Sequence, residues 1–292
     1  MPRAKSNGIE LEYDTFGEPG SPAVLLVMGW ATQMIAWSEE FCETLAARGL
    51  HVIRFDNRDV GLSTKLDQHP GPGLASLVLR RGKPPYSLDD MAADAVGLLD
   101  ALGIRQAHVV GASMGGFIAQ LIAINHPERT LSLTSIMSGL GGKDAVQPSL
   151  SVTARLLKPP PSERDALIEW GVRTARLIGS PAYFDEDRVR AFRARSIDRA
   201  VSLAGVRRQF AAISSAPSRK SALGRLRVPA LVIHGDADRL VPVENGRRTA
   251  AAIPGAKLMI LPGMGHDLPP QLWPEVIDAI ADLAAVPTRA KA

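Results

Sequence analysis

The sequence predicts an α/β protein with a doubly wound, mostly parallel sheet and a helical cap inserted between two late strands. Three observations lead to this prediction. Short apolar runs alternate with amphipathic segments along most of the chain, as in parallel sheets covered by helices on both faces. The composition, with 46% hydrophobic and 22% charged residues among 292, is typical of a folded globular protein. One long internal stretch, 139–227, contains no run typical of a buried strand.

Six continuous apolar runs predict the parallel strands, because a strand buried on both faces needs no alternation of apolar and polar residues. The segment Ile9–Phe16 does alternate, and it predicts an antiparallel edge strand before the others. The six runs are Pro22–Met28, Leu50–Asp56, Ala107–Gly111, Leu131–Met137, Val228–Ile233 and Ala256–Leu261.

Helical patterns fill the intervals between these strands. The best-defined start is Ser87-Leu88-Asp89-Asp90, which has the spacing of a capping box, and Gly103 provides the corresponding stop. The predicted helices cover about Ala36–Arg48, Ser87–Leu102, Met114–Asn125, Glu244–Ile253 and Trp273–Leu283.

The stretch 139–227 predicts a helical cap, and residues 1–138 together with 228–292 form the core domain. Because the insertion leaves the sheet after the strand Leu131–Met137, its helices are expected to lie over the carboxyl end of the sheet. Removal of the cap is expected to change KM and chain-length preference more than the catalytic residues. The residues expected to face the sheet are Leu156, Leu157, Leu167, Ile168, Trp170, Val172, Leu177, Ile178, Phe184, Phe192, Val206, Phe210 and Ile213.

The charge distribution is uneven. The chain carries a net charge of +4, but Arg155–Arg227 contains 14 Arg and 2 Lys against 7 Asp and Glu, a net charge of +9. These arginines alternate with apolar and acidic residues, and aromatic residues are too few for base stacking. We therefore expect a solvated outer surface of the cap and no nucleic-acid partner.

The sequence also predicts a cytoplasmic protein without membrane insertion. The single cysteine, Cys42, excludes an intramolecular disulfide. The first residues lack the apolar segment of a signal peptide, and no apolar run reaches the roughly 20 residues of a membrane helix.

The candidate nucleophile is Ser113, in the pentapeptide Gly111-Ala112-Ser113-Met114-Gly115. G-x-S-x-G alone is weakly specific, but here a predicted strand precedes it and a predicted helix follows it. A sharp strand-to-helix turn exposes the serine Oγ, and glycines avoid a collision across the turn. The alternative is that Ser113 only caps the helix.

A serine hydroxyl needs a neighbouring base to act as a nucleophile at neutral pH. Of the six histidines, only His266 lies on a Gly-rich loop after the last predicted strand, at the end of the sheet where such folds place their chemistry. It is the candidate base. The others lie in strands, at element ends or in a Pro/Gly loop, namely His51, His69, His108, His126 and His234.

Two carboxylates follow the strand that ends at Ile233, and one of them is expected to orient the base. Asp236 comes directly after the strand-end glycine, where it is expected to cap the turn. Asp238 lies further along the loop and is the candidate acid.

The oxyanion hole is expected to combine two backbone N–H groups. One belongs to Met114, the residue after the nucleophile. The other belongs to Trp30, on the loop where Gly29 permits a turn. Met28, Trp30 and Met114 are expected to line the substrate pocket. The alternative is that Trp30 is a core residue and Gly29 a plain turn.

Together these residues resemble the α/β-hydrolase family from about Gly8 to Leu283. The chain order serine, aspartate, histidine is the order of that family. The segment Phe55–Ser63 resembles its D-x-R-G-x-G-x-S turn, but Asp59 stands where glycine is usual. The segments around Met28, His51 and His266 are similar to the aclacinomycin methylesterase-like branch.

The resemblance implies a cofactor-free serine esterase without a metal that acts on a small-molecule ester through an acyl-enzyme. Two alternatives use the same residues: perhydrolysis or cofactor-free haloperoxidation, and C–C bond hydrolysis. A third alternative, of another class, is a catalytically silent ligand receptor on the same fold. The serine at position 113 excludes dehalogenases and epoxide hydrolases, which need a carboxylate there.

Overall fold

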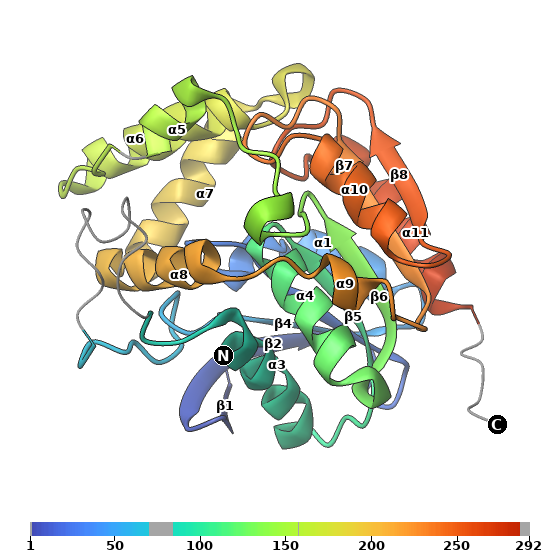
Figure 1. Ribbon diagram of the computed structural model, residues 1–292. Helices are drawn as coiled ribbons and strands as arrows, with labels where there is room; N and C mark the ends of the chain where they lie inside the picture. Colours follow the sequence, from blue (N-terminus) through green and yellow to red (C-terminus); the bar gives the residue numbers. More distant parts are fainter. Residues whose placement is uncertain (1, 70–83, 157, 287–292) are drawn as a thin grey trace.

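The computed structural model describes residues 2–69, 84–156 and 158–286. Within these ranges, eight strands form one sheet in the order β1-β2-β4-β3-β5-β6-β7-β8 (Figure 1). The pairs β1–β2 and β2–β4 are antiparallel, and all later pairs are parallel. The predicted fold class is therefore confirmed. The strands are β1 (Arg3–Ser6), β2 (Ile9–Phe16), β3 (Ala23–Val27), β4 (His51–Phe55), β5 (Ala107–Ala112), β6 (Thr130–Ile136), β7 (Ala230–Gly235) and β8 (Lys257–Leu261).

The prediction that Ile9–Phe16 forms the edge of the sheet is wrong. The strand β1 lies outside it, with Arg3 opposite Glu12 and Ser6 opposite Ile9. The four residues of β1 are mostly polar, so no apolar pattern marks them as a strand.

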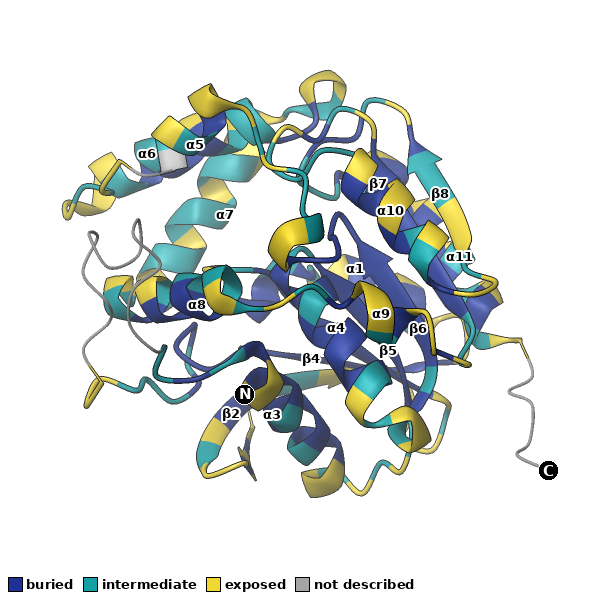
Figure 2. Ribbon diagram, viewed as in Figure 1, coloured by how far each residue is buried: buried dark blue, intermediate teal, exposed yellow. Residues whose placement is uncertain are grey.

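Helices cover both faces of the sheet, and each face has its own apolar core. On one face α3 (Leu88–Ala101) and α4 (Met114–Asn125) pack together, and α9 (Lys220–Leu223) and α10 (Glu244–Ala252) continue this layer. On the other face lie α1 (Glu39–Ala46) and α11 (Trp273–Ala284). The central strands, β3 to β7, are almost entirely buried, whereas β8 at the edge of the sheet is partly exposed (Figure 2).

Two helix starts show how local sequence determines these elements. The Ser87 hydroxyl accepts the Asp90 N–H at 3.2 Å, and the Asp90 carboxylate accepts the Ser87 N–H at 2.7 Å, which completes the predicted capping box. The helix predicted from Ala36 begins at Glu39, because the Trp37 backbone is extended and the Ser38 side chain caps the N-terminus of α1. A separate 3₁₀ turn, Met34–Ala36, precedes α1. The other 3₁₀ turns in the described residues are Pro127–Arg129, Gly142–Asp144, Pro181–Tyr183 and Pro270–Leu272.

Between β6 and β7 the chain is helical, as predicted. Figure 1 shows α5, α6 and α7 grouped at one side of the sheet, with α8 between them and the core. Leu157 and the side chain of Leu156 lie outside the described residues, and the other residues predicted to face the sheet are all buried or half-buried. The helices of this segment before α9 are α5 (Leu150–Leu156), α6 (Arg164–Ile178), α7 (Glu186–Arg199) and α8 (Leu203–Ser215).

The expectation that the surplus arginines lie on the outer surface is only partly right. Arg208 is 0% exposed and Arg219 is 4% exposed. The Arg208 guanidinium donates to both oxygens of the buried Asp59 carboxylate, at 2.8 and 2.7 Å. Asp59 therefore holds a helix of the cap against the core, and it also accepts the Tyr86 hydroxyl at 2.7 Å.

This ion pair predicts a large effect on stability. Arg208→Met leaves the Asp59 carboxylate buried without its cation, and we expect the free energy of unfolding to fall by about 3–5 kcal/mol. Urea denaturation of the variant and of Arg207→Met, which alters the exposed neighbour, measures this difference. Equal stability of the two variants would contradict it.

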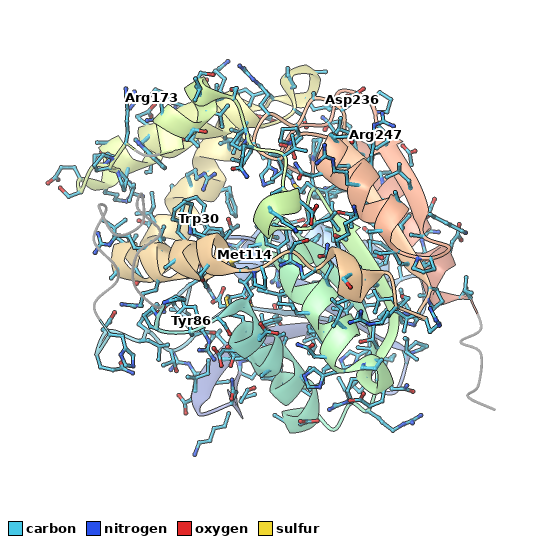
Figure 3. The ribbon with its side chains drawn as sticks, viewed as in Figure 1. Trp30, Tyr86, Met114, Arg173, Asp236 and Arg247 are labelled. Atoms are coloured by element: carbon cyan, nitrogen blue, oxygen red, sulfur yellow. The ribbon has the colours of Figure 1, made fainter. Side chains whose placement is uncertain are left out.

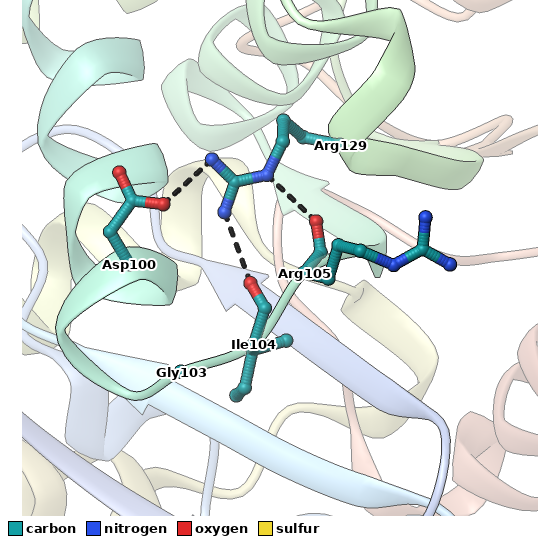
Figure 4. A pocket seen from close by; sticks show the side chains of 5 residues that line it. All are labelled: Asp100, Gly103, Ile104, Arg105 and Arg129. Atoms are coloured by element: carbon teal, nitrogen blue, oxygen red, sulfur yellow. Dashed lines mark hydrogen bonds and ion pairs between the residues drawn. The ribbon is translucent and has the colours of Figure 1, made fainter.

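An open hollow of about 380 Å³ lies at the opposite end of the sheet from Ser113 (Figure 4). It is lined by Asp100, Gly103, Ile104, Arg105 and Arg129. Arg105 lies just before β5, whereas Ser113 follows that strand directly. The hollow is therefore separate from the candidate active site. The described helices include none long and apolar enough to cross a membrane.

Candidate active site

Ser113 lies on the turn between β5 and α4, with φ 56° and ψ −119°. An added Cβ at Gly111 would lie 2.0 Å from the Gly115 carbonyl oxygen, and one at Gly115 would lie 2.1 Å from the Val27 carbonyl oxygen. Only glycine fits these two positions, so the turn is as tight as the sequence predicts. The Ser113 side chain makes no capping hydrogen bond, which leaves its hydroxyl available for another partner.

The structure brings Ser113, His266 and Asp238 together in one hydrogen-bonded chain. His266 Nε2 lies 2.9 Å from Ser113 Oγ, and His266 Nδ1 lies 2.8 Å from Asp238 Oδ2. The three residues follow β5, β8 and β7, and the carboxyl ends of these parallel strands meet at one edge of the sheet. This arrangement can transfer a proton from the serine to the imidazole while the carboxylate stabilises the positive charge that forms.

The surroundings of Asp238 keep its carboxylate ionised. Its Oδ1 accepts the backbone N–H groups of Leu240 and Val241, at 2.9 and 2.8 Å. Burial of Asp238 raises its pKa, but the attraction of His266 and the hydrogen bonds from His234, His266 and Val241 outweigh burial and lower the pKa to about 2.

Asp236, labelled in Figure 3, is exposed, and among the described residues its side chain makes no hydrogen bond to Ser113, His266 or Asp238. Its carboxylate accepts the Gly263 N–H at 2.7 Å, so it caps the loop that follows β8.

The low pKa of Asp238 predicts the pH dependence of catalysis. A carboxyl group with a lowered pKa is ionised at every pH above that value, and the paired form is lost only as the pH falls through about 2. We therefore expect no ionisation of Asp238 to appear in kcat/KM above about pH 4. The pH–rate profile of p-nitrophenyl ester hydrolysis measures this. An ionisation between about pH 4 and 6 that disappears in Asp238→Asn would contradict the assignment.

Sequence reasoning missed a second histidine at this site. His234 Nε2 lies 2.7 Å from the Val241 carbonyl oxygen and 3.5 Å from Asp238 Oδ2. A carbonyl oxygen only accepts, so Nε2 carries the hydrogen and donates it to Val241, while Asp238 Oδ2 lies further from the same nitrogen. The spacing of four residues between His234 and Asp238 after a strand end was the one available signal.

The loop after β3 lies directly against the nucleophile. An added Cβ at Gly29 would lie 3.1 Å from Ser113 Cβ and 3.2 Å from the Ala112 carbonyl oxygen. Within the described chain, no acceptor is seen for the Trp30 backbone N–H. The Met114 N–H, in the first turn of α4, has no acceptor within its own helix. Trp30 follows Gly29, which packs against Ser113, and Met114 follows Ser113 directly, so both N–H groups remain candidates for the oxyanion hole.

The three predicted pocket residues differ in their surroundings. Trp30 is half-buried, its ring lies 5.3 Å from that of Phe210 in the cap, and its indole N–H donates to the Val206 carbonyl oxygen at 2.8 Å (Figure 3). Met28 and Met114 are buried in the cores on opposite faces of the sheet. Trp30 thus offers more surface to a ligand than either methionine.

The cap also holds the loop that carries His266. The backbone N–H of His266 donates to the Ile178 carbonyl oxygen at 2.7 Å, and the backbone N–H of Gly265 donates to Ser180 Oγ at 2.8 Å. An added Cβ at Gly265 would lie 2.2 Å from the Gly179 carbonyl carbon. The segment between β6 and β7 therefore forms part of the support of His266, and the expectation that its removal changes KM more than the catalytic residues stays a prediction.

The part of the chain that the structure describes contains no group of three or more His, Cys, Asp or Glu side chains placed to hold a metal ion.

Comparison with known proteins agrees with this geometry. Residues 22–270 match the family model described as alpha/beta hydrolase fold. Rhodomycin D methylesterases of Streptomyces sp. (strain C5) and of Streptomyces peucetius are 34% and 33% identical to the chain over 286 residues, which cover 89% of this chain and 90% of each relative. The crystal structure of the enol-lactonase from Burkholderia xenovorans LB400 matches 97% of this chain and 99% of its own with a TM-score of 0.77; at 24% identity it shows the shared fold. The chain belongs to the α/β-hydrolase family.

Proposed function

We propose that the protein is a cofactor-free serine hydrolase that cleaves carboxylic esters through an acyl-enzyme intermediate. The observation that carries this proposal is the hydrogen-bonded chain from Ser113 Oγ through His266 to Asp238, with distances of 2.9 and 2.8 Å. The relatives at 33–34% identity are methylesterases, which favours esters over the alternatives.

In the proposed reaction, Ser113 Oγ attacks the ester carbonyl carbon while His266 Nε2 takes its proton. The N–H groups of Trp30 and Met114 stabilise the oxyanion of the tetrahedral intermediate. His266 then gives the proton to the leaving alcohol, and the acyl group stays on Ser113. Water attacks this acyl-enzyme with His266 as the base, and the carboxylic acid leaves as Ser113 regains its proton.

We assign substrate selection to a cap domain, 139–227, set on a core of 1–138 and 228–292. Trp30 and the apolar side chains that the cap turns inward favour an apolar ester, and the methylesterase relatives point to a methyl ester as the reacting group. The proposal places the enzyme in the cytoplasm with a small-molecule ester as its substrate and no nucleic-acid partner.

One panel of substrates tests the proposal. The purified protein is assayed with p-nitrophenyl esters of rising chain length, with apolar methyl esters by methanol release, with a C–C diketone, and with acetate plus peroxide. The proposal predicts that both ester classes turn over faster than the diketone and that peracid formation is minor. Faster C–C cleavage or peracid formation would overturn it, and ligand binding without any turnover would indicate the receptor alternative.

A further inference from the structure

One face of the cap helix α8 contacts the loop that presents the oxyanion donor. Val206, Gln209 and Phe210, spaced three and four residues apart, share this face. Val206 and Phe210 bind the Trp30 side chain, as described above, whereas the Gln209 side chain reaches the backbone. Its Oε1 accepts the Ala31 N–H at 3.0 Å.

Gln209 is 0% exposed and uses both ends of its amide. Its Nε2 donates to the Arg58 carbonyl oxygen at 2.9 Å. One buried side chain on α8 therefore connects the loop after β3, at Ala31, with the turn after β4, at Arg58. Both segments are distant from α8 in the sequence.

The peptide that Gln209 holds is in an unfavourable conformation. Ala31 has φ 56°, which a residue with a side chain adopts only at an energetic cost. The carbonyl oxygen of the same peptide, that of Trp30, accepts the Thr32 hydroxyl at 3.0 Å. The Trp30–Ala31 peptide is thus held at its N–H and at its C=O. The neighbouring peptide, which carries the Trp30 N–H, is held at its own C=O, because the Gly29 carbonyl oxygen accepts the Thr32 N–H at 3.3 Å.

The helix that carries Gln209 is itself firmly placed on the core. The adjacent Arg208 binds the Asp59 carboxylate with two hydrogen bonds, at 2.8 and 2.7 Å. An added Cβ at Gly205 would lie 2.3 Å from the Asp59 carbonyl oxygen, so the two backbones touch. A side chain on a helix held this closely has little freedom to move away from Ala31.

We propose that Gln209 is a positioning residue of the oxyanion hole: the cap orients the Trp30 N–H toward the reacting carbonyl through the bond from Ala31 to Gln209. This inference rests on the proposed ester hydrolysis. It gives a cap residue a role in the chemical step, whereas a cap that only selects substrates acts through KM.

The test compares Gln209→Met with the wild type. Methionine keeps the length and the apolar stem but removes both hydrogen bonds. We expect kcat for a p-nitrophenyl ester to fall about 10- to 100-fold, with KM within about threefold, because an oxyanion donor acts on the transition state. A trifluoromethyl ketone, which adds to the serine and forms an oxyanion, should bind more weakly by a similar factor.

Two control variants separate this effect from a loss of stability. Arg207→Met changes an exposed residue of the same helix, and Thr174→Val removes a buried hydrogen bond to the Trp170 carbonyl oxygen within α6. Both should keep kcat and the inhibition constant of the ketone within about twofold, even where Thr174→Val lowers the melting temperature.

Gln209→Asn provides a second variant, because its shorter amide does not span both partners. Wild-type kcat in either folded variant would overturn the proposal. So would a loss confined to KM, an unchanged inhibition constant, or failure of both variants to fold, which would make Gln209 a purely structural residue. An inactive wild type would instead reject the proposed ester hydrolysis.

Discussion

Ser113→Ala is expected to remove ester turnover, with kcat falling by about 10⁶-fold, as for loss of the nucleophile in other triad enzymes. The variant loses only an oxygen atom, and this oxygen makes no capping hydrogen bond, so the fold and the melting temperature should stay unchanged. Initial rates with p-nitrophenyl acetate, together with circular dichroism, measure both quantities.

His266→Ala is expected to be about as inactive as Ser113→Ala, because the two residues act as one unit. For the same reason the double variant should be no worse than either single variant. Substantial activity in either single variant would reject the serine mechanism.

Asp238→Asn is expected to lower kcat by about 10⁴-fold. Asp238 Oδ2 accepts from His266 Nδ1 at 2.8 Å, and an asparagine that turns its NH₂ group there favours the tautomer of His266 that leaves no base toward Ser113. The loss should appear in kcat, measured with the same p-nitrophenyl ester.

The matched control is Asp236→Asn, two residues away on the same loop. This exposed carboxylate binds only the Gly263 N–H among the described residues, so kcat should change less than about tenfold. A larger loss in Asp236→Asn than in Asp238→Asn would show that the acid is assigned to the wrong residue.

Ser113, His266 and Asp238 could be chosen from the sequence because each lies on a loop or turn that directly follows an apolar run typical of a buried parallel strand. Ser113 lies between an apolar run and a helical pattern, and the structure places it on a turn between β5 and α4 that only glycines at 111 and 115 permit. His266 and Asp238 each follow an apolar run, and the carboxyl ends of parallel strands meet at one edge.

The contacts that support these residues could not be predicted, because they join segments distant in the chain. Arg208 and Asp59 are 149 residues apart, and Gln209 and Ala31 are 178 residues apart. Among the many arginines of the cap, no local pattern distinguishes Arg208, which is buried, from Arg207, which is exposed.

The departure from the family pattern at Asp59 has a physical explanation in these contacts. The backbone there has φ 71°, a conformation that favours glycine. Aspartate adopts it here with its carboxylate bound to Arg208, Tyr86 and the Leu66 N–H. The ion pair to the cap thus offsets the backbone strain.

The most direct test of the central claim is covalent labelling with a fluorophosphonate, followed by mass spectrometry of the digested protein. The account predicts one adduct, on Ser113, whose formation removes esterase activity in proportion to labelling and is strongly slowed in His266→Ala. An active esterase that takes no label, or that carries its adduct on another residue, would contradict it.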